Sequence, residues 1–190
     1  LLSAAIISIY LFLFLNLLHL YFYRFPVYAS DGWFFQDRLL SRYLQLTTQK
    51  FPDSKIFIST PEPKIIFEEY LFYTNLYGGT ETALINENLN RQDYSLGKVT
   101  FINSCLARKI TKNEIWIYED SLGCEKNGRM GETLRITRLK DVHENYLIKQ
   151  DKVCQEQKLG SYIPLTALQD FNLEKQEVGY FCQNWITKLF

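Results

Sequence analysis

The chain has 190 residues, of which 47% are hydrophobic, and its 21 basic residues equal its 21 acidic residues in number. Basic and acidic side chains alternate along the sequence, which argues against the concentrated basic surface that nucleic-acid binding requires. We therefore expect no nucleic-acid partner.

The first segment, Leu1 to Tyr23, contains no Asp, Glu, Lys or Arg. About 20 apolar residues in a helix span roughly 30 Å, the thickness of the hydrocarbon core of a bilayer. A secretory signal has a shorter apolar stretch after a basic start, although Val27-Tyr28-Ala29 resembles a cleavage site. We expect a transmembrane helix within residues 1–25, with a signal peptide or a buried soluble helix as the alternatives.

No Met begins the chain, so we expect it to be part of a longer protein whose last membrane helix is this one. Asn16 and His19 share a helix face, and Ala4 with Ser8 forms a pair of small residues that lets another helix approach. Both features favour a helix bundle, although His19 could simply reach the lipid headgroups.

Aromatic residues follow the apolar segment, as they do at the interface between a membrane and water. Pro26 is expected to end the helix nearby. The predicted membrane-interface residues are Tyr21, Tyr23, Arg24, Tyr28 and Trp33.

Residues 26–190 are predicted to form one small α/β domain with a mixed sheet and flanking helices. A helix capped by Ser30 or Asp31 is expected through residues 33–49, followed by a strand at Lys55 to Ser59. A second helix follows Pro61, with Ser59 and Glu62 as a capping box or Thr60 as an alternative start, and Gly78 and Gly79 end it.

The rest of the domain is predicted to alternate loops and short strands. Residues 80–98 are expected to be a loop with one helical turn near Asn86 to Asn90, and residues 165–171 to be a short helix. Residues 178–190 are expected to be helical because Phe181, Trp185 and Leu189 are spaced four apart. The expected strands are Val99 to Asn103, Glu114 to Glu119, residues 133–139 and Glu144 to Gln150.

Four cysteines, Cys105, Cys124, Cys154 and Cys182, all lie in the polar part and form no CxxC pair. This spacing suits two disulfides on an oxidising side of the membrane better than zinc ligation, and four reduced thiols are the alternative. Three pairings exist. We favour Cys105 with Cys124 and Cys154 with Cys182, because sequential loops close at the least entropic cost.

The polar part offers no self-sufficient active site. Glu68 and Glu69 are adjacent on a helix and point in different directions, so a solvated face is the better interpretation than an acid–base pair. His143 has no nucleophile motif beside it, and Ser59 and Thr60 lack the glycine pattern of a phosphate loop. We predict no catalytic residue and no metal ligand in this chain.

Two segments carry a family resemblance: YFYRFPVYASDGWFFQDRLLSRYL and KIFISTPEPKIIFEEYLFYTN. With LIKQDKVC, SYIPLTALQDF and YFCQNWI, they resemble the carboxyl-terminal end of GT-C-type membrane glycosyltransferases, relatives of the dolichyl-phosphate-mannose-protein mannosyltransferases and of the aminoarabinose lipid A transferases. In these enzymes a bundle of membrane helices ends in an extracytoplasmic α/β domain.

The resemblance implies transfer of a sugar from a polyprenyl-phosphate carrier to a lipid, glycan or protein acceptor. It places the catalytic acidic residues in an upstream loop, so this chain would be accessory, without a cofactor of its own, while a divalent metal could serve the full-length enzyme. The implied partners are membrane lipid, the upstream helix bundle and the carrier-linked sugar. The implied location is a bacterial inner membrane or its equivalent. The alternative function is a single-pass anchored extracytoplasmic domain that binds a partner without catalysis.

Overall fold

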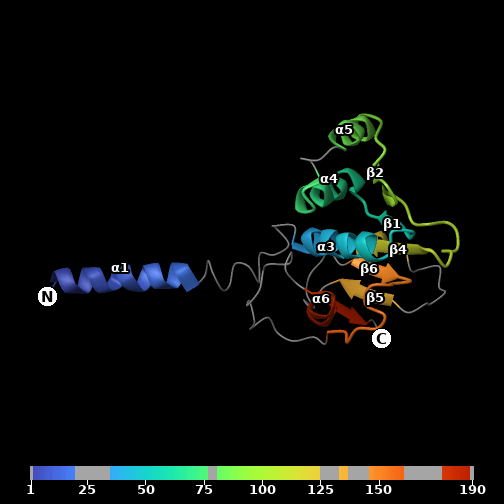
Figure 1. Cartoon of the computed structure of the whole chain (residues 1–190). Coiled ribbons are helices and arrows are strands. Elements are labelled where there is room, and N and C mark those ends of the chain that lie inside the picture. Colours follow the sequence, from blue (N-terminus) through green and yellow to red (C-terminus); the bar gives the residue numbers. More distant parts are fainter. Residues whose placement is uncertain are drawn as a thin grey trace.

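A computed structural model describes residues 2–19, 35–76, 81–124, 133–136, 146–160 and 177–188. The fold is α/β, as predicted, with one mixed sheet of seven strands (Figure 1). The strand order is β2-β3-β1-β4-β6-β5-β7. The helices are α1 (Leu2–His19), α3 (Phe35–Lys50), α4 (Pro63–Tyr73), α5 (Thr82–Asn90), the 3-10 turn η4 (Asp120–Leu122) and α6 (Val178–Trp185). The strands are β1 (Lys55–Ser59), β2 (Ser95–Leu96), β3 (Val99–Ile102), β4 (Glu114–Glu119), β5 (Thr133–Ile136), β6 (Tyr146–Lys149) and β7 (Ile186–Lys188).

The centre of the sheet consists of three parallel strands, with β1 between β3 and β4. These are the strands that short apolar runs predicted, and β1 and β4 have the predicted bounds. The strands β2, β6, β5 and β7 are all antiparallel to their neighbours. The parallel centre fixes the polarity of the sheet, so it has a distinct carboxyl edge and amino edge.

One face of the sheet forms the core together with the helices. Ile56 and Ile58 of β1 and Ile115 and Ile117 of β4 alternate toward this face and are fully buried. They belong to one hydrophobic cluster with buried residues of α3, α4 and α6. Phe101 of β3 packs against aromatic rings of α4, which fixes that helix on the parallel strands. The domain therefore has a core of its own.

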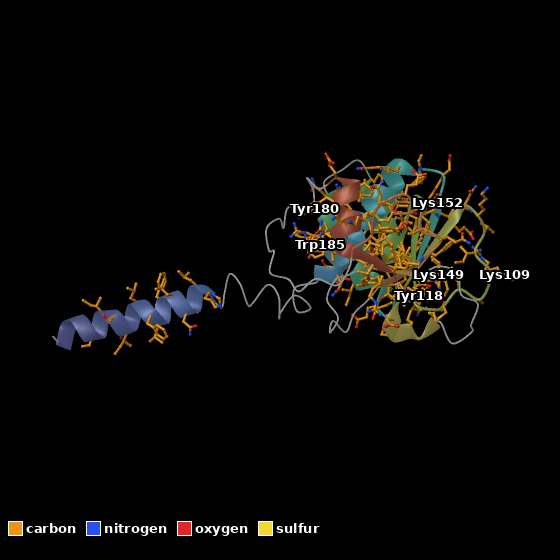
Figure 2. All side chains as sticks on the ribbon, turned by 90° about the horizontal axis from the view of Figure 1, so that it is seen from below. Lys109, Tyr118, Lys149, Lys152, Tyr180 and Trp185 are labelled. Atoms are coloured by element: carbon orange, nitrogen blue, oxygen red, sulfur yellow. A yellow bond between two sulfur atoms is a disulfide. The ribbon has the colours of Figure 1, made fainter. Side chains whose placement is uncertain are left out.

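The opposite face carries the alternate residues of the same strands. Trp116 and Tyr118 of β4 lie on it with ring centroids 4.5 Å apart, and the Trp116 indole donates a 2.8 Å hydrogen bond to the Ser59 hydroxyl. The Arg108 guanidinium lies 5.3 Å above the ring of Phe57 in β1. Figure 2 shows Tyr118 and Lys149 near one another in this part of the domain, away from Tyr180 and Trp185 on α6.

The start of α4 differs from the prediction. The Ser59–Glu62 capping box is wrong, because Ser59 ends β1 and its hydroxyl accepts the hydrogen bond from Trp116. Glu62 is the residue before the helix, and it makes no side-chain cap. Its backbone N–H instead donates to the Thr60 hydroxyl at 3.3 Å, and Pro63 occupies the first helical position, where a missing N–H costs nothing.

Two other segments also differ from their predictions. Residues 80–98 were expected to be mostly loop, but nine of them form α5 and two form β2. The final segment is helical only to Trp185, and Ile186 to Lys188 then extend as β7, because they pair with β5 at the edge of the sheet. The predicted helix at residues 165–171, the cap at Ser30 or Asp31 and the Gly78-Gly79 turn lie outside the described residues.

The helix α1 (blue) lies apart from the sheet domain in Figure 1. Nearly all of its described large apolar side chains are exposed, including Tyr10 at 71% and Phe12 at 69%. Within the ranges that the structure describes, no helix combines the length and apolar character needed to cross a bilayer. The helix accounts for 18 residues of the predicted membrane segment.

Candidate functional site

The carboxyl edge of the parallel strands is the place in this fold where a site is expected. The chain leaves β1 for β3 on one side, whereas β4, on the other side of β1, leads to the antiparallel strands. Ligands of open α/β sheets bind where neighbouring strands lead in opposite directions like this. The candidate site is therefore the edge between Ser59 of β1 and Glu119 of β4.

Glu119 is the central residue of this edge. Its side chain lies at the end of β4 and the residue is only 8% exposed. One carboxylate oxygen accepts a 2.9 Å hydrogen bond from the Thr60 hydroxyl, and the other accepts a hydrogen bond from the Ser121 hydroxyl. The carboxylate is thus held by one hydroxyl from each of the two strand exits, which compensates part of the cost of its burial.

Thr60 has two roles at this edge. While its hydroxyl donates to Glu119, the same oxygen accepts the backbone N–H of Glu62, and its own backbone N–H donates to Ile102 of β3 at 2.9 Å. It therefore joins the end of β1 to β3, to β4 and to the start of α4. Ser59 and Thr60 are therefore both engaged in structural hydrogen bonds, Ser59 with Trp116 and Thr60 with Glu119 and Glu62.

A second buried carboxylate, Asp37, lies beside this edge. It is 1% exposed and accepts a 2.5 Å hydrogen bond from the hydroxyl of Tyr146. Tyr146 begins β6 and is paired in register with Glu119, so Asp37 and Glu119 lie near the same end of the sheet. The start of α3 is thereby fixed to the carboxyl edge.

Glu69 and Tyr73 of α4 are further titratable groups, and the charge of Asp37 acts on Tyr73. The pKa of Glu69 is raised, mainly by burial. The hydrogen bond with Tyr73 lowers this pKa, and the charge of Glu68 raises it further. Burial and the charges of Glu69 and Asp37 raise the pKa of Tyr73 to about 12. Tyr73 is therefore a neutral hydroxyl at physiological pH. Glu68 lies 4.0 Å from Lys64, so the two adjacent glutamates have different partners.

The domain contains two disulfides, and each joins two different segments of the fold. Cys105, after β3, is bonded to Cys124, after η4, so the exits of β3 and β4 are linked beside the candidate site. Cys154, after β6, is bonded to Cys182 of α6. This is the pairing favoured from the sequence, and no cysteine is free. The disulfides are consistent with an extracytoplasmic domain in an oxidising compartment.

Chemically, the edge is a network of carboxylates satisfied by hydroxyl donors. Such a network holds strand exits and helix starts in place. In the part of the chain that the structure describes, no group of three or more His, Cys, Asp or Glu side chains is arranged to hold a metal.

The predicted membrane-interface residues and His143 lie outside the described residues. Neither Glu119 nor Asp37 was predicted as a site residue from the sequence. The only available signal was position, since Glu119 ends an apolar strand and Asp37 stands in the first turn of an amphipathic helix.

Comparisons with known proteins add no relative. No family model, no curated protein and no solved structure matches the chain.

Proposed function

We propose that this chain is the outer, accessory part of an integral-membrane glycosyltransferase that transfers a sugar from a polyprenyl-phosphate carrier to a lipid, glycan or protein acceptor. Residues 1–25 are its last membrane helix, and residues 26–190 form a domain on the extracytoplasmic side. The catalytic residues belong to the upstream part of the protein. The family assignment is supported by the sequence resemblance alone.

The observation that carries the membrane part of the proposal is the contrast between α1 and the sheet domain. The domain buries its own core, whereas α1 exposes Ile7, Phe12 and Leu17 at 60% or more. Exposed apolar area costs roughly 25 cal/mol per Å² in water, so a helix of this kind needs lipid or other helices around it. The charge-free sequence also continues beyond α1 to Tyr23.

The disulfides support the outer location of the domain. Cytosolic thiols are kept reduced, and both disulfides of this domain join segments that are distant in sequence. A domain on the cytoplasmic side would have its four cysteines reduced.

The carboxyl edge supports an accessory role next to the membrane bundle. Asp37 is the third residue of α3, and α3 is the next described element after α1. Because the Asp37 carboxylate accepts a hydrogen bond from Tyr146, the carboxyl edge is joined to the end of α3 that is nearer in sequence to the proposed bundle. It is the part of the domain best placed to touch the bundle or an acceptor bound there.

The upstream reading frame tests the enzyme proposal directly. The glycosyltransferase proposal predicts eight or more further apolar segments, with a pair of carboxylates in the first outer loop. A start Met and a short basic leader directly before Leu1 would contradict it. That result would favour the alternative, a single-pass anchored binding domain, to which the self-contained core of the domain is equally suited.

A functional test uses the full-length protein in its own membrane. Glu119→Gln keeps the shape of the side chain and removes its charge. If the edge only positions the domain, this variant should keep measurable transfer of the sugar in a membrane assay with carrier-linked donor. Loss of all transfer in a correctly folded, membrane-inserted variant would contradict an accessory role for this edge.

A further inference from the structure

An open cleft of about 480 Å³ lies near the amino edge of the sheet, at the opposite end of α3 from the candidate site. Three segments line it: the end of α3, the turn before β4 and the loop after β6. The lining residues are Lys50, Phe51, Lys112, Asn113, Lys152, Val153, Gln155, Glu156 and Gln157. Every one of them lies within the described residues.

The charge of the cleft is predominantly positive. Lys50, Lys112 and Lys152 come from the three different segments, and Glu156 is the only carboxylate in the lining. Two lysines outside the cleft are paired with acids, Lys98 with Asp53 at 3.2 Å and Lys64 with Glu68 at 4.0 Å. Within the described ranges, none of the three cleft lysines forms an ion pair. Three ammonium groups against one carboxylate in one cleft favour a multivalent anion.

The wall that carries Lys152 is held firmly. Asp151 is buried and accepts hydrogen bonds from the backbone N–H groups of Val153 and Cys154 at 3.1 and 2.8 Å, and from the Tyr43 hydroxyl. Cys154 is tied to α6 by its disulfide. Lys152 itself donates a 2.9 Å hydrogen bond to the Ser54 hydroxyl, which directs its side chain toward the loop before β1.

We infer that this cleft binds a soluble phosphate-bearing ligand with at least two negative charges close together, such as a pyrophosphate or a phosphate monoester. The lysines supply point charges, and the amides of Asn113, Gln155 and Gln157 supply neutral donors and acceptors around them. The inference does not depend on the proposed transferase function.

The position of the cleft favours a soluble source of phosphate over a lipid headgroup. α3 begins at Phe35 and is the next described element after α1, whereas the cleft lies at Lys50, the last residue of α3. Sixteen helical residues span about 24 Å. The cleft is therefore about one helix length from the end of α3 that is nearer in sequence to the proposed membrane segment.

The test is a titration of the purified full chain in phosphatidylcholine nanodiscs with sodium pyrophosphate, followed by the backbone amide signals of residues 50–55, 111–114 and 151–157. We expect saturable shifts in these segments that weaken as NaCl is raised. Lys50→Gln with Lys112→Gln should weaken binding several-fold, and adding Lys152→Gln should weaken it at least about tenfold, since each exposed charge contributes modestly.

The matched control replaces three lysines outside the cleft, Lys64, Lys98 and Lys109, with Gln and changes the net charge equally. Figure 2 shows Lys109 at the periphery of the domain. The control should bind pyrophosphate like the unaltered chain. The double variant keeps Lys152 and its bond to Ser54, so a folding defect in the triple variant does not remove the test.

Three results would overturn the inference. The first is an absence of shifts in the cleft segments with pyrophosphate, and the second is equal weakening by the cleft and control triple variants. The third is a response of these segments to nanodiscs that contain phosphatidylglycerol but not to pyrophosphate, which would assign the cleft to lipid headgroups.

Discussion

The Tyr43 hydroxyl in α3 donates a 2.5 Å hydrogen bond to Asp151, which lies 108 residues later in the loop after β6. Both residues are buried, and the loop also carries the cysteine bonded to α6. This one contact joins a helix of the first third of the domain to its last third. It also shapes the wall of the basic cleft.

Replacing Tyr43 with Phe should destabilise the domain by about 1–3 kcal/mol, because a buried carboxylate loses a hydroxyl donor. Burial raises the pKa of Asp151, and the bonds from Tyr43 and the backbone amides lower it. The Asp151 carboxyl should therefore titrate at a higher pH in the variant, as carboxyl NMR can measure. Tyr180→Phe, at an exposed position of α6, is the control, and an equal loss of stability in both variants would contradict the role of the buried bond.

Arg108 and Glu114 predict an acid-dependent stability. The guanidinium donates to both carboxylate oxygens, at 2.6 and 2.8 Å. This pairing and the Thr111 backbone N–H lower the pKa of Glu114 to about 2. Because the folded pKa lies below the unfolded value of about 4.3, the contribution is present above pH 4.3 and is lost as the pH falls toward 2.

Denaturant unfolding between pH 2 and 6 measures this contribution. The unaltered chain should lose stability as the pH falls below about 4.3, and Glu114→Gln should lose less stability over the same range. Glu87→Gln, in the exposed pair with Arg91, should lose as much as the unaltered chain. Identical pH profiles for Glu114→Gln and the unaltered chain would show that the pairing does not persist in solution.

The two disulfides should each stabilise the domain by about 3 kcal/mol, since they close loops between cysteines separated by 19 and 28 residues. Serine pairs at positions 105 and 124, or at 154 and 182, should lower the unfolding midpoint in the oxidised protein. Both variants should respond less to reductant than the unaltered chain does. An unaltered chain that unfolds at the same midpoint with and without dithiothreitol would contradict this prediction.

Thr60→Val should destabilise the carboxyl edge by about 1–3 kcal/mol, because Glu119 loses a donor and the Glu62 N–H loses an acceptor. Thr60→Ser keeps the hydroxyl and should be nearly neutral. Thermal unfolding followed by circular dichroism compares the two variants. Equal stability of the two variants would mean that the hydroxyl network contributes nothing measurable.

The sequence was sufficient for the parts of the fold that depend on local pattern. β1 and β4 are short apolar runs whose alternation places Ile56, Ile58, Ile115 and Ile117 on one buried face. The helical spacing of Phe181 and Trp185 was also correct. The sequence alone does not reveal that the helix ends before Ile186, because the change from helix to strand depends on pairing of Ile186 with Ile136 in β5.

The candidate site depends on contacts across long sequence separations, and these have no local pattern. Glu119 meets a hydroxyl 59 residues earlier, and Asp37 meets one 109 residues later. The predicted capping role of Ser59 failed for the same reason, since the indole of Trp116 occupies its hydroxyl. The favoured disulfide pairing agreed with the structure because the argument from loop length needs only sequence separations.

The central proposal is a disulfide-bonded domain held on the outer side of a membrane by the charge-free first segment. Its most direct test expresses the full-length protein, washes the membranes with alkaline carbonate, and treats intact cells or spheroplasts with protease and with a thiol-alkylating reagent before and after reduction. We predict that the protein stays in the membrane pellet, that protease from outside removes the domain, and that its cysteines react only after reduction. A protein that the carbonate wash releases, or a membrane-bound protein protected from outside with four freely reacting thiols, would contradict the proposal.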